Sequence, residues 1–176
     1  MDEIIIAEYD PRWPEMFEEE AARVRQTLEA GLITRIEHFG STAVPGLAAK
    51  PVIDMLVGVR SLAEAEHVAI GALAALGYAC WYDNPDKEHM FFVKGLPPNG
   101  PRSHHIHMVG PGSVFWERLL FRDYLRGHPE EARRYSQLKR DLAARLTEDR
   151  EAYTDAKGAY VRAVTEKAKG ESLSGC

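Results

Sequence analysis

The sequence predicts an α/β protein in which a mixed β-sheet is flanked by helices and followed by a C-terminal helical layer. Short β-prone runs alternate with amphipathic runs through the first two thirds of the chain, and the last third is helical in its periodicity. Glycines punctuate the pattern, with Gly31 and Gly77 each placed where an amphipathic run stops. About five strands are expected, some of them antiparallel.

The first half of the chain predicts two helices and two strands. Residues 13–30 place Met16, Phe17 and Val24 near one helical face, and Ser61 is a candidate N-cap for an alanine-rich helix. The run after Lys50-Pro51 is nearly all apolar, as expected for a strand covered on both faces. The predicted elements are helix 13–30, strand 33–39, strand 52–59 and helix 62–76.

The second half predicts three more strands and three helices. Ser113 is a candidate cap, Pro129 suits a first helical turn, and Thr147 or Glu148 opens the last helix. The tail of small and polar residues, 170–176, is expected to be disordered, which leaves residues 1–169 as a single domain. The predicted elements are strands 78–82 and 90–94, a histidine-rich strand within 102–109, helix 114–126 and helices that begin near 129 and 147.

Composition narrows the class of protein. The 176 residues are 45% hydrophobic, enough for a sizeable core, and a formal charge of −5 argues against general nucleic-acid binding. The sequence shows no secretion signal and no membrane-spanning run, so the predicted location is cytoplasmic. Cys80 and Cys176 are expected to be free thiols.

The segment from His38 to Asp54 is the main candidate for a functional site. Gly40, Ser41 and Thr42 form a small-residue turn that can bind phosphate through backbone N–H groups and hydroxyls, although a plain turn is the alternative. Asp54 places a carboxylate in an apolar strand, where an isolated charge costs several kcal/mol unless it is paired or bound to a cation. This stretch therefore predicts a phosphate cradle and a carboxylate at neighbouring strand ends.

Two histidines are candidate partners of that carboxylate. His105 and His107 stand two residues apart in a β-prone run, so they project from the same face, and His104 points the other way. Two imidazoles and one carboxylate suit Zn, Mn, Fe or Ni better than a pair of Mg ions. The alternative is that both histidines hydrogen-bond Asp54 or a phosphate. A histidine-triad hydrolase is disfavoured because its third histidine position is Val109.

Cationic residues elsewhere are candidates for phosphate binding. Lys50 precedes the strand that contains Asp54, and Arg102 precedes the histidine-rich strand. The alternative is that each is an ordinary solvent-exposed loop residue. Lys139 follows Tyr135 by four residues on one helical face, and Lys157 follows Tyr153 in the same way. The alternative is that the tyrosines pack at the core edge while the lysines reach solvent.

These motifs, taken together, resemble the GrpB-like family, whose members resemble nucleotidyltransferase-fold proteins. The resemblance is carried by the following stretches of the chain, which span most of residues 8–168: the stretch 38–54, Arg102 to Val109, Phe121 to Arg126 with His128-Pro129, Tyr135 with Leu138-Lys139, and Tyr153 with Lys157. In actinobacteria a similar domain is found fused to dephospho-coenzyme A kinase. No phosphate-binding kinase loop occurs here, so kinase activity is not implied.

The resemblance implies a nucleotidyltransferase-like sheet and a ligand that is a nucleotide or another phosphorylated small molecule. Transferases of that fold carry carboxylates at i and i+2 of one strand, and here Asp54 fits the first while Leu56 occupies the second. Metal-dependent nucleotidyl transfer, with Mg, Mn or Zn, is therefore expected alongside its alternative, a non-catalytic nucleotide- or coenzyme-binding module. The expected catalytic residues are Asp54 and His107. The expected metal ligands are Asp54, His105 and His107, and the expected ligand-binding residues are His38, Gly40, Ser41, Thr42, Lys50, Arg102 and Lys139.

Overall fold

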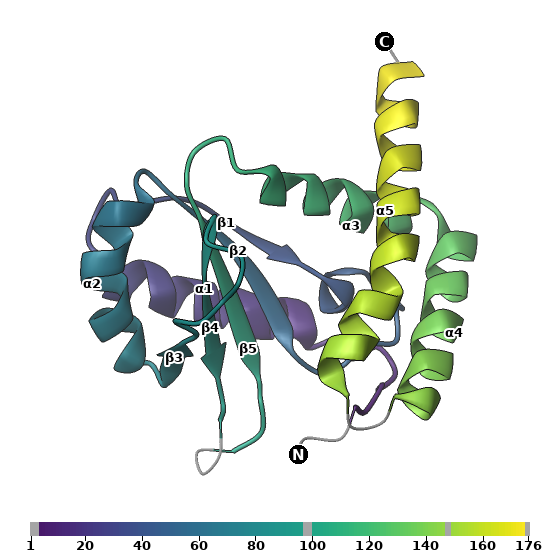
Figure 1. The fold of residues 1–176 in the computed structure, drawn as a ribbon, viewed down its shortest axis with the longest axis horizontal. Helices are drawn as coiled ribbons and strands as arrows, with labels where there is room; N and C mark the ends of the chain where they lie inside the picture. Colours follow the sequence, from purple (N-terminus) through teal and green to yellow (C-terminus); the bar gives the residue numbers. More distant parts are fainter. Residues whose placement is uncertain (1–3, 97–99, 147–148, 175–176) are drawn as a thin grey trace. The chain divides into compact units, whose positions relative to one another are not determined.

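The computed structural model describes residues 4–96, 100–146 and 149–174 (Figure 1). The chain divides into two compact units, each assembled from separate stretches of sequence. One unit contains the ranges Arg12–Phe39 and Val52–Phe115, and is called here the sheet unit. The other contains Met1–Pro11, Gly40–Pro51 and Trp116–Cys176, and is called the helical unit.

The sheet unit is built on five strands in the order β1-β2-β5-β4-β3. The two central strands, β2 and β5, pair in parallel, and the remaining neighbours pair antiparallel. This arrangement confirms the predicted mixed sheet. The strands are β1 (Ile33–Phe39), β2 (Ile53–Val59), β3 (Tyr78–Cys80), β4 (His89–Lys94) and β5 (His104–Val109).

Two helices pack on this sheet. Helix α1 (Trp13–Thr27) contacts β1 and β2, helix α2 (Leu62–Ala74) contacts β3 and β4, and the two helices contact each other. Ser61 caps α2 as predicted, since its side chain accepts a hydrogen bond from the Glu64 N–H at 3.2 Å. Helix α1 is shorter than predicted because the backbone turns extended at Leu28, and Gly31 then takes a φ of +84° before β1.

The helical unit is an all-helical layer, as predicted for the last third of the chain. Its helices are η1 (a 3-10 turn, Ser41–Ala43), α3 (Arg118–Gly127), α4 (Pro129–Arg145) and α5 (Arg150–Ser174). The core of this unit joins Val44 and Leu47 to residues of all three α-helices, namely Leu125, Tyr135 and Val164. The N-terminal segment is tied to the second stretch by paired backbone hydrogen bonds between Ala7 and Ala49, at 2.8 and 2.9 Å.

Two further helices differ from the sequence prediction. The predicted helix 114–126 begins as a separate 3-10 turn, η2 (Val114–Glu117), and the Ser113 hydroxyl accepts from the Phe115 N–H at 3.2 Å. Helix α5 continues to Ser174, past the predicted tail start at residue 170. In that stretch Glu171 forms an ion pair with His128 of the same unit at 3.5 Å. The predicted helix start at Thr147 or Glu148 lies outside the described residues.

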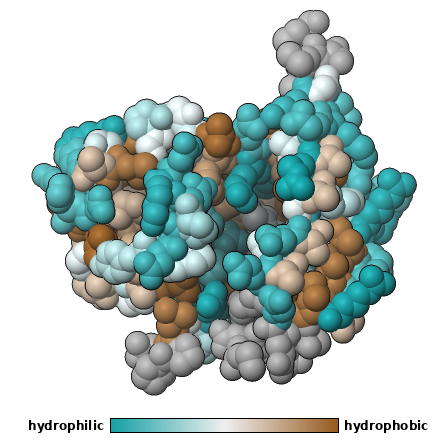
Figure 2. Space-filling model, viewed as in Figure 1, coloured by the Kyte–Doolittle hydropathy of each residue, from teal (hydrophilic) through white to brown (hydrophobic). Residues whose placement is uncertain are grey.

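The visible surface is mostly hydrophilic, with hydrophobic residues in separate patches (Figure 2). Large exposed hydrophobic side chains of the described residues are Ile5, Trp81, Tyr82 and Val114. Among the helices of the described ranges, none combines the length and the apolar character that crossing a bilayer requires.

Candidate metal-binding site

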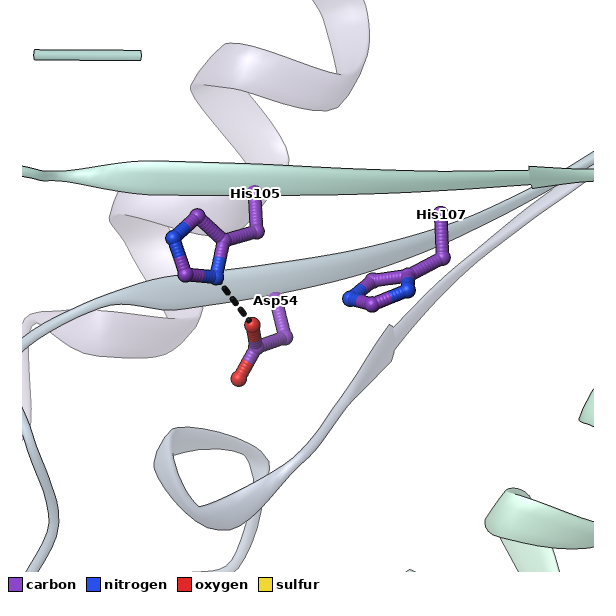
Figure 3. A group of neighbouring side chains, drawn as sticks. All are labelled: Asp54, His105 and His107. Carbon is purple, nitrogen blue, oxygen red and sulfur yellow. Dashed lines mark hydrogen bonds and ion pairs between the residues drawn. The ribbon is translucent and has the colours of Figure 1, made fainter. Parts of the chain in front are cut away.

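The parallel pairing of β2 and β5 places Asp54 beside two histidines. In the strand register Asp54 pairs with His105, and Leu56 pairs with His107. Because alternate residues of a strand share a face, Asp54, His105 and His107 all project from the same side of the two strands (Figure 3). The same-face prediction for the histidines therefore agrees with the register.

The three side chains lie within reach of a common ion. His105 Nδ1–H donates to Asp54 Oδ1 at 3.1 Å, and one ligand atom from each of the three residues lies within 4.8 Å of the others. Two atoms that each lie about 2.1 Å from a metal are at most about 4.2 Å apart, so a small side-chain rotation completes the geometry. The donor set of two imidazoles and a carboxylate is one that Zn and other transition metals accept.

Aromatic rings surround His107. It lies 5.3 Å from the stacked His89 ring and 4.6 Å from the Phe91 ring. Phe39 approaches it edge-on at 5.2 Å, and Phe115 lies at 5.8 Å. Such a shell restrains the imidazole and lowers the local polarity, which strengthens electrostatic interactions there.

This shell is not predicted from the sequence. His89 and Phe91 share one face of β4, but the predicted strand begins at residue 90, and Phe115 falls within the predicted helix 114–126. The alternation of His89 and Phe91 in a β-prone run was the available signal. Which strand lies beside β5 depends on the tertiary pairing, and no local pattern gives it.

His38 lies on the opposite face of the sheet. Its ring stacks on Phe17 of α1 at 4.7 Å with an interplanar angle of 7°, whereas its neighbour Phe39 contacts His107. His104 also lies on the α1 face, where burial lowers the pKa of its imidazole against the opposing charge of Glu20. His38 is therefore separate from the group formed by Asp54, His105 and His107. Arg102, another predicted ligand-binding residue, precedes β5 in the sheet unit and is half-buried.

The predicted phosphate-binding turn belongs to the helical unit. Gly40 has a φ of +73°, which favours glycine, and the turn is closed by N–H groups of Ala43 and Val44 that donate to Gly40 and Ser41 at 3.3 and 3.2 Å. Arg126 of α3 donates to the Ala43 carbonyl through two nitrogens, at 3.0 and 2.7 Å. Thr42 is buried and Ser41 is half-buried. This local network fixes the turn through the N–H groups of the two residues that follow Thr42.

Lys50 and Lys139 also belong to the helical unit, where each lies against a tyrosine ring. The Lys50 ammonium is 4.2 Å from the centre of the Tyr153 ring, and that of Lys139 is 4.6 Å from the centre of Tyr135. The predicted grouping of Tyr135 with Lys139 on one helical face is confirmed as a cation–π contact.

Leu56 is fully buried beside His107. The position where a two-metal transferase carries its second carboxylate is therefore occupied by a core side chain. The fold and the three-ligand group together define an α/β protein with a candidate mononuclear metal site.

Comparison with known proteins identifies the family. Residues 3–167 match the family described as "GrpB protein", and the chain belongs to that family. A UPF0157 protein of Pseudomonas aeruginosa is 45% identical over 95% of this chain and 68% of its own length. A crystal structure of GrpB from Enterococcus faecalis covers 96% of this chain and 99% of its own, with a TM-score of 0.85 and 32% identity.

Two further matches cover less than half of the matched protein. A protein of Mycolicibacterium paratuberculosis named dephospho-CoA kinase is 32% identical over 87% of this chain, which spans 43% of that protein. The structure of the Cid1 poly(U) polymerase matches over 77% of this chain and 44% of its own, at 11% identity and a TM-score of 0.46, a likeness too distant to carry an argument.

Proposed function

We propose that this protein binds one divalent metal ion through Asp54, His105 and His107 and uses it to bind a nucleotide or another phosphorylated small molecule. The observation that carries the proposal is the convergence of three ligand atoms within 4.8 Å on one face of β2 and β5. Imidazole ligands favour Zn or Mn over Mg, and three protein ligands leave coordination positions for a phosphate oxygen.

Nucleotidyl transfer is the reaction that this group would serve. A bound metal ion supplies Lewis-acid stabilisation of charge on the transferring phosphoryl group. Asp54 holds its carboxylate toward His105, and the aromatic shell holds the His107 ring in place. In the arrangement where Asp54 and His105 alone hold the ion, the His107 imidazole would instead accept the proton of the attacking hydroxyl, provided that hydroxyl binds within hydrogen-bond reach, and the rest of the phosphate chain of the nucleotide would leave.

A non-catalytic binding module is the second candidate. It is favoured by Leu56, since a fully buried leucine removes the second metal ion of a two-metal mechanism. Such a module would bind nucleotide or coenzyme without turnover.

One thermal-stability experiment separates the candidates. Melting temperatures are measured for the wild type, Asp54→Asn and His107→Gln with nucleotides, coenzyme A and sugar phosphates, each with Mg, Mn or Zn. A ligand at 100 times its Kd stabilises the native state by about 2.7 kcal/mol, or roughly 5 °C or more for a chain of this size. We expect a metal-dependent shift that both variants lose.

The control is His67→Gln, which removes an exposed histidine of α2 and should leave the shift unchanged. A nucleotide shift that needs no metal and survives in Asp54→Asn would support the binding module instead. If no metal raises the wild-type melting temperature, the metal-binding proposal is wrong.

A further inference from the structure

An exposed tryptophan lies at the end of the row of aromatic rings that borders the candidate metal site. Trp81 directly follows β3, and its N–H donates to the Phe91 carbonyl at 2.9 Å, which places it opposite Phe91 of β4. The Trp81 and Phe91 rings are in edge contact, with 5.9 Å between their centres. The Phe91 ring in turn lies 5.1 Å from the His105 ring and 4.6 Å from the His107 ring. Phe91 therefore connects Trp81 to two of the three candidate metal ligands.

These residues lie on one face of one compact unit. All of them belong to the sheet unit. Phe91 pairs with His107 in the register of β4 and β5, and His107 projects from the same side as Asp54 (Figure 3). Helix α1 lies against the opposite face, where its Phe17 stacks on His38. The face that carries Trp81 and the candidate metal ligands is thus the one that α1 does not cover.

The Trp81 ring is restrained and yet open to solvent. The residue is 49% exposed, although tryptophan is on average one of the more buried residue types. Its backbone hydrogen bond and its contact with Phe91 restrain the indole ring. A flat ligand ring that covers the exposed surface would remove apolar area from water, and little side-chain entropy would be lost because the indole is already ordered.

The separation between Trp81 and the candidate metal ligands matches the dimensions of a nucleotide. One strand, β4, lies between β3 and β5, so residues 81 and 107 are two strand spacings apart, or about 10 Å. The ribose that joins a base to its phosphates bridges a gap of this order. Aromatic side chains are also the surfaces on which proteins stack bases.

We propose that Trp81 stacks on the base of a nucleotide whose phosphates bind the metal ion. The inference rests on the proposed function, because the ion at Asp54, His105 and His107 is what fixes the phosphates. It narrows the ligand from phosphorylated small molecules in general to those that carry a base. It assigns no preference among the bases, because each of them has a π face.

The test is calorimetric titration of the Zn-loaded protein with ATP, GTP, CTP and UTP, and with inorganic tripolyphosphate, which has the three phosphates without a base. We expect Trp81→Ala to weaken nucleotide binding by about tenfold and to leave tripolyphosphate binding unchanged. Trp81→Phe should restore most of the nucleotide affinity, because phenylalanine also offers a stacking ring. The quenching of tryptophan fluorescence that a stacked base causes should be present in the wild type and lost in Trp81→Phe.

The matched control is Tyr82→Ala, which removes the exposed aromatic ring next to Trp81 in sequence and should leave both affinities unchanged. Far-ultraviolet circular dichroism establishes that each variant is folded. Equal nucleotide affinity in the wild type and Trp81→Ala, or no nucleotide binding by the wild type, would overturn the inference. It would also be overturned if Trp81→Ala weakened tripolyphosphate binding as much as nucleotide binding, or if Tyr82→Ala caused the same loss.

Titration with Zn alone distinguishes this failure from that of the proposed function. Binding of Zn and of tripolyphosphate, with no effect of Trp81→Ala on the nucleotides, leaves the proposed function intact and removes the stacking role. Nucleotide binding that depends on Trp81, in a protein that does not bind Zn, supports the stacking role and removes the metal site.

Discussion

The charged residue Asp54 shows how a polar group is accommodated in a sheet. Its side chain is 26% exposed and is hydrogen-bonded to His105, so the carboxylate is neither isolated nor fully desolvated. The expected cost of a charge in an apolar strand is therefore offset by a partner on the adjacent strand. The same two atoms can bind a metal ion once the proton lies on Nε2 of His105, because an imidazole binds a metal through its unprotonated nitrogen.

The site residues differ in how far sequence predicts them. Asp54, His105 and His107 follow from strand alternation and residue chemistry, and the register brings them together. His38 was grouped with the phosphate turn because it adjoins it in sequence, but its ring lies against α1. Alternation alone does not say which face of the strand a helix covers, so it does not show that the His38 ring faces away from Asp54.

Lys139 gives a prediction for the pH dependence of stability. Its pKa falls from 10.5 to about 7 in the fold, so between these values the unfolded chain binds more protons than the native protein. Native stability should therefore rise with pH across this window, by up to about 1.4 kcal/mol per pH unit, and the penalty should be fully present below pH 7.

The measurement compares denaturant unfolding of the wild type and Lys139→Met from pH 6 to pH 10. The groups around Lys139 are Tyr135 and Arg140 on α4 and Lys157 on α5, with Glu8 paired to Arg140. We expect the stability of the variant relative to the wild type to decrease as pH rises. A difference that does not change with pH would contradict a lowered pKa at Lys139.

At the scale of elements, the parallel pairing of β2 and β5 places residue 56, which is a leucine and not a carboxylate, beside the candidate metal ligands. Leu56 faces the same side as Asp54 and pairs with His107, so a carboxylate at residue 56 would lie next to the candidate metal ligands. Leu56→Asp should destabilise the protein by several kcal/mol, because it buries an uncompensated charge. A bound divalent metal ion should restore much of the free energy of unfolding that Leu56→Asp loses.

The control variant is Leu56→Asn, because asparagine has a shape similar to that of aspartate and carries no charge. Melting temperatures of both variants are measured with and without Mn or Zn. We expect the metal to stabilise Leu56→Asp by more than Leu56→Asn. Equal stabilisation of the two variants would mean that a carboxylate at residue 56 does not interact with the bound metal ion.

Element boundaries were predicted best where a local cap or breaker exists. Ser61 begins α2 through its side-chain hydrogen bond, and Gly77, placed where the amphipathic run stops, has a positive φ of +86° between α2 and β3. The predicted helix 114–126 was less accurate, because Ser113 initiates a 3-10 turn before α3. The end of α5 depends on ion pairs within its own unit, and composition does not show these.

At the scale of the whole molecule, neither compact unit is a continuous piece of sequence. The chain passes from one unit to the other after residues 11, 39, 51 and 115. A unit that depends on several returns of the chain cannot be removed as one fragment without breaking the other. The single-domain organisation expected for residues 1–169 stays a prediction.

The interleaved path leads to a prediction for calorimetric unfolding. We expect one cooperative transition whose calorimetric and van't Hoff enthalpies agree, because the stretch Gly40–Pro51 of the helical unit lies in sequence between β1 and β2 and loses both of its fixed ends when those strands unfold. Zn binding at Asp54, His105 and His107 should then raise the melting temperature of the whole transition, and Asp54→Asn should abolish the effect. Two transitions, of which Zn moves only one, would show that the units unfold independently and that the ion stabilises the sheet unit alone.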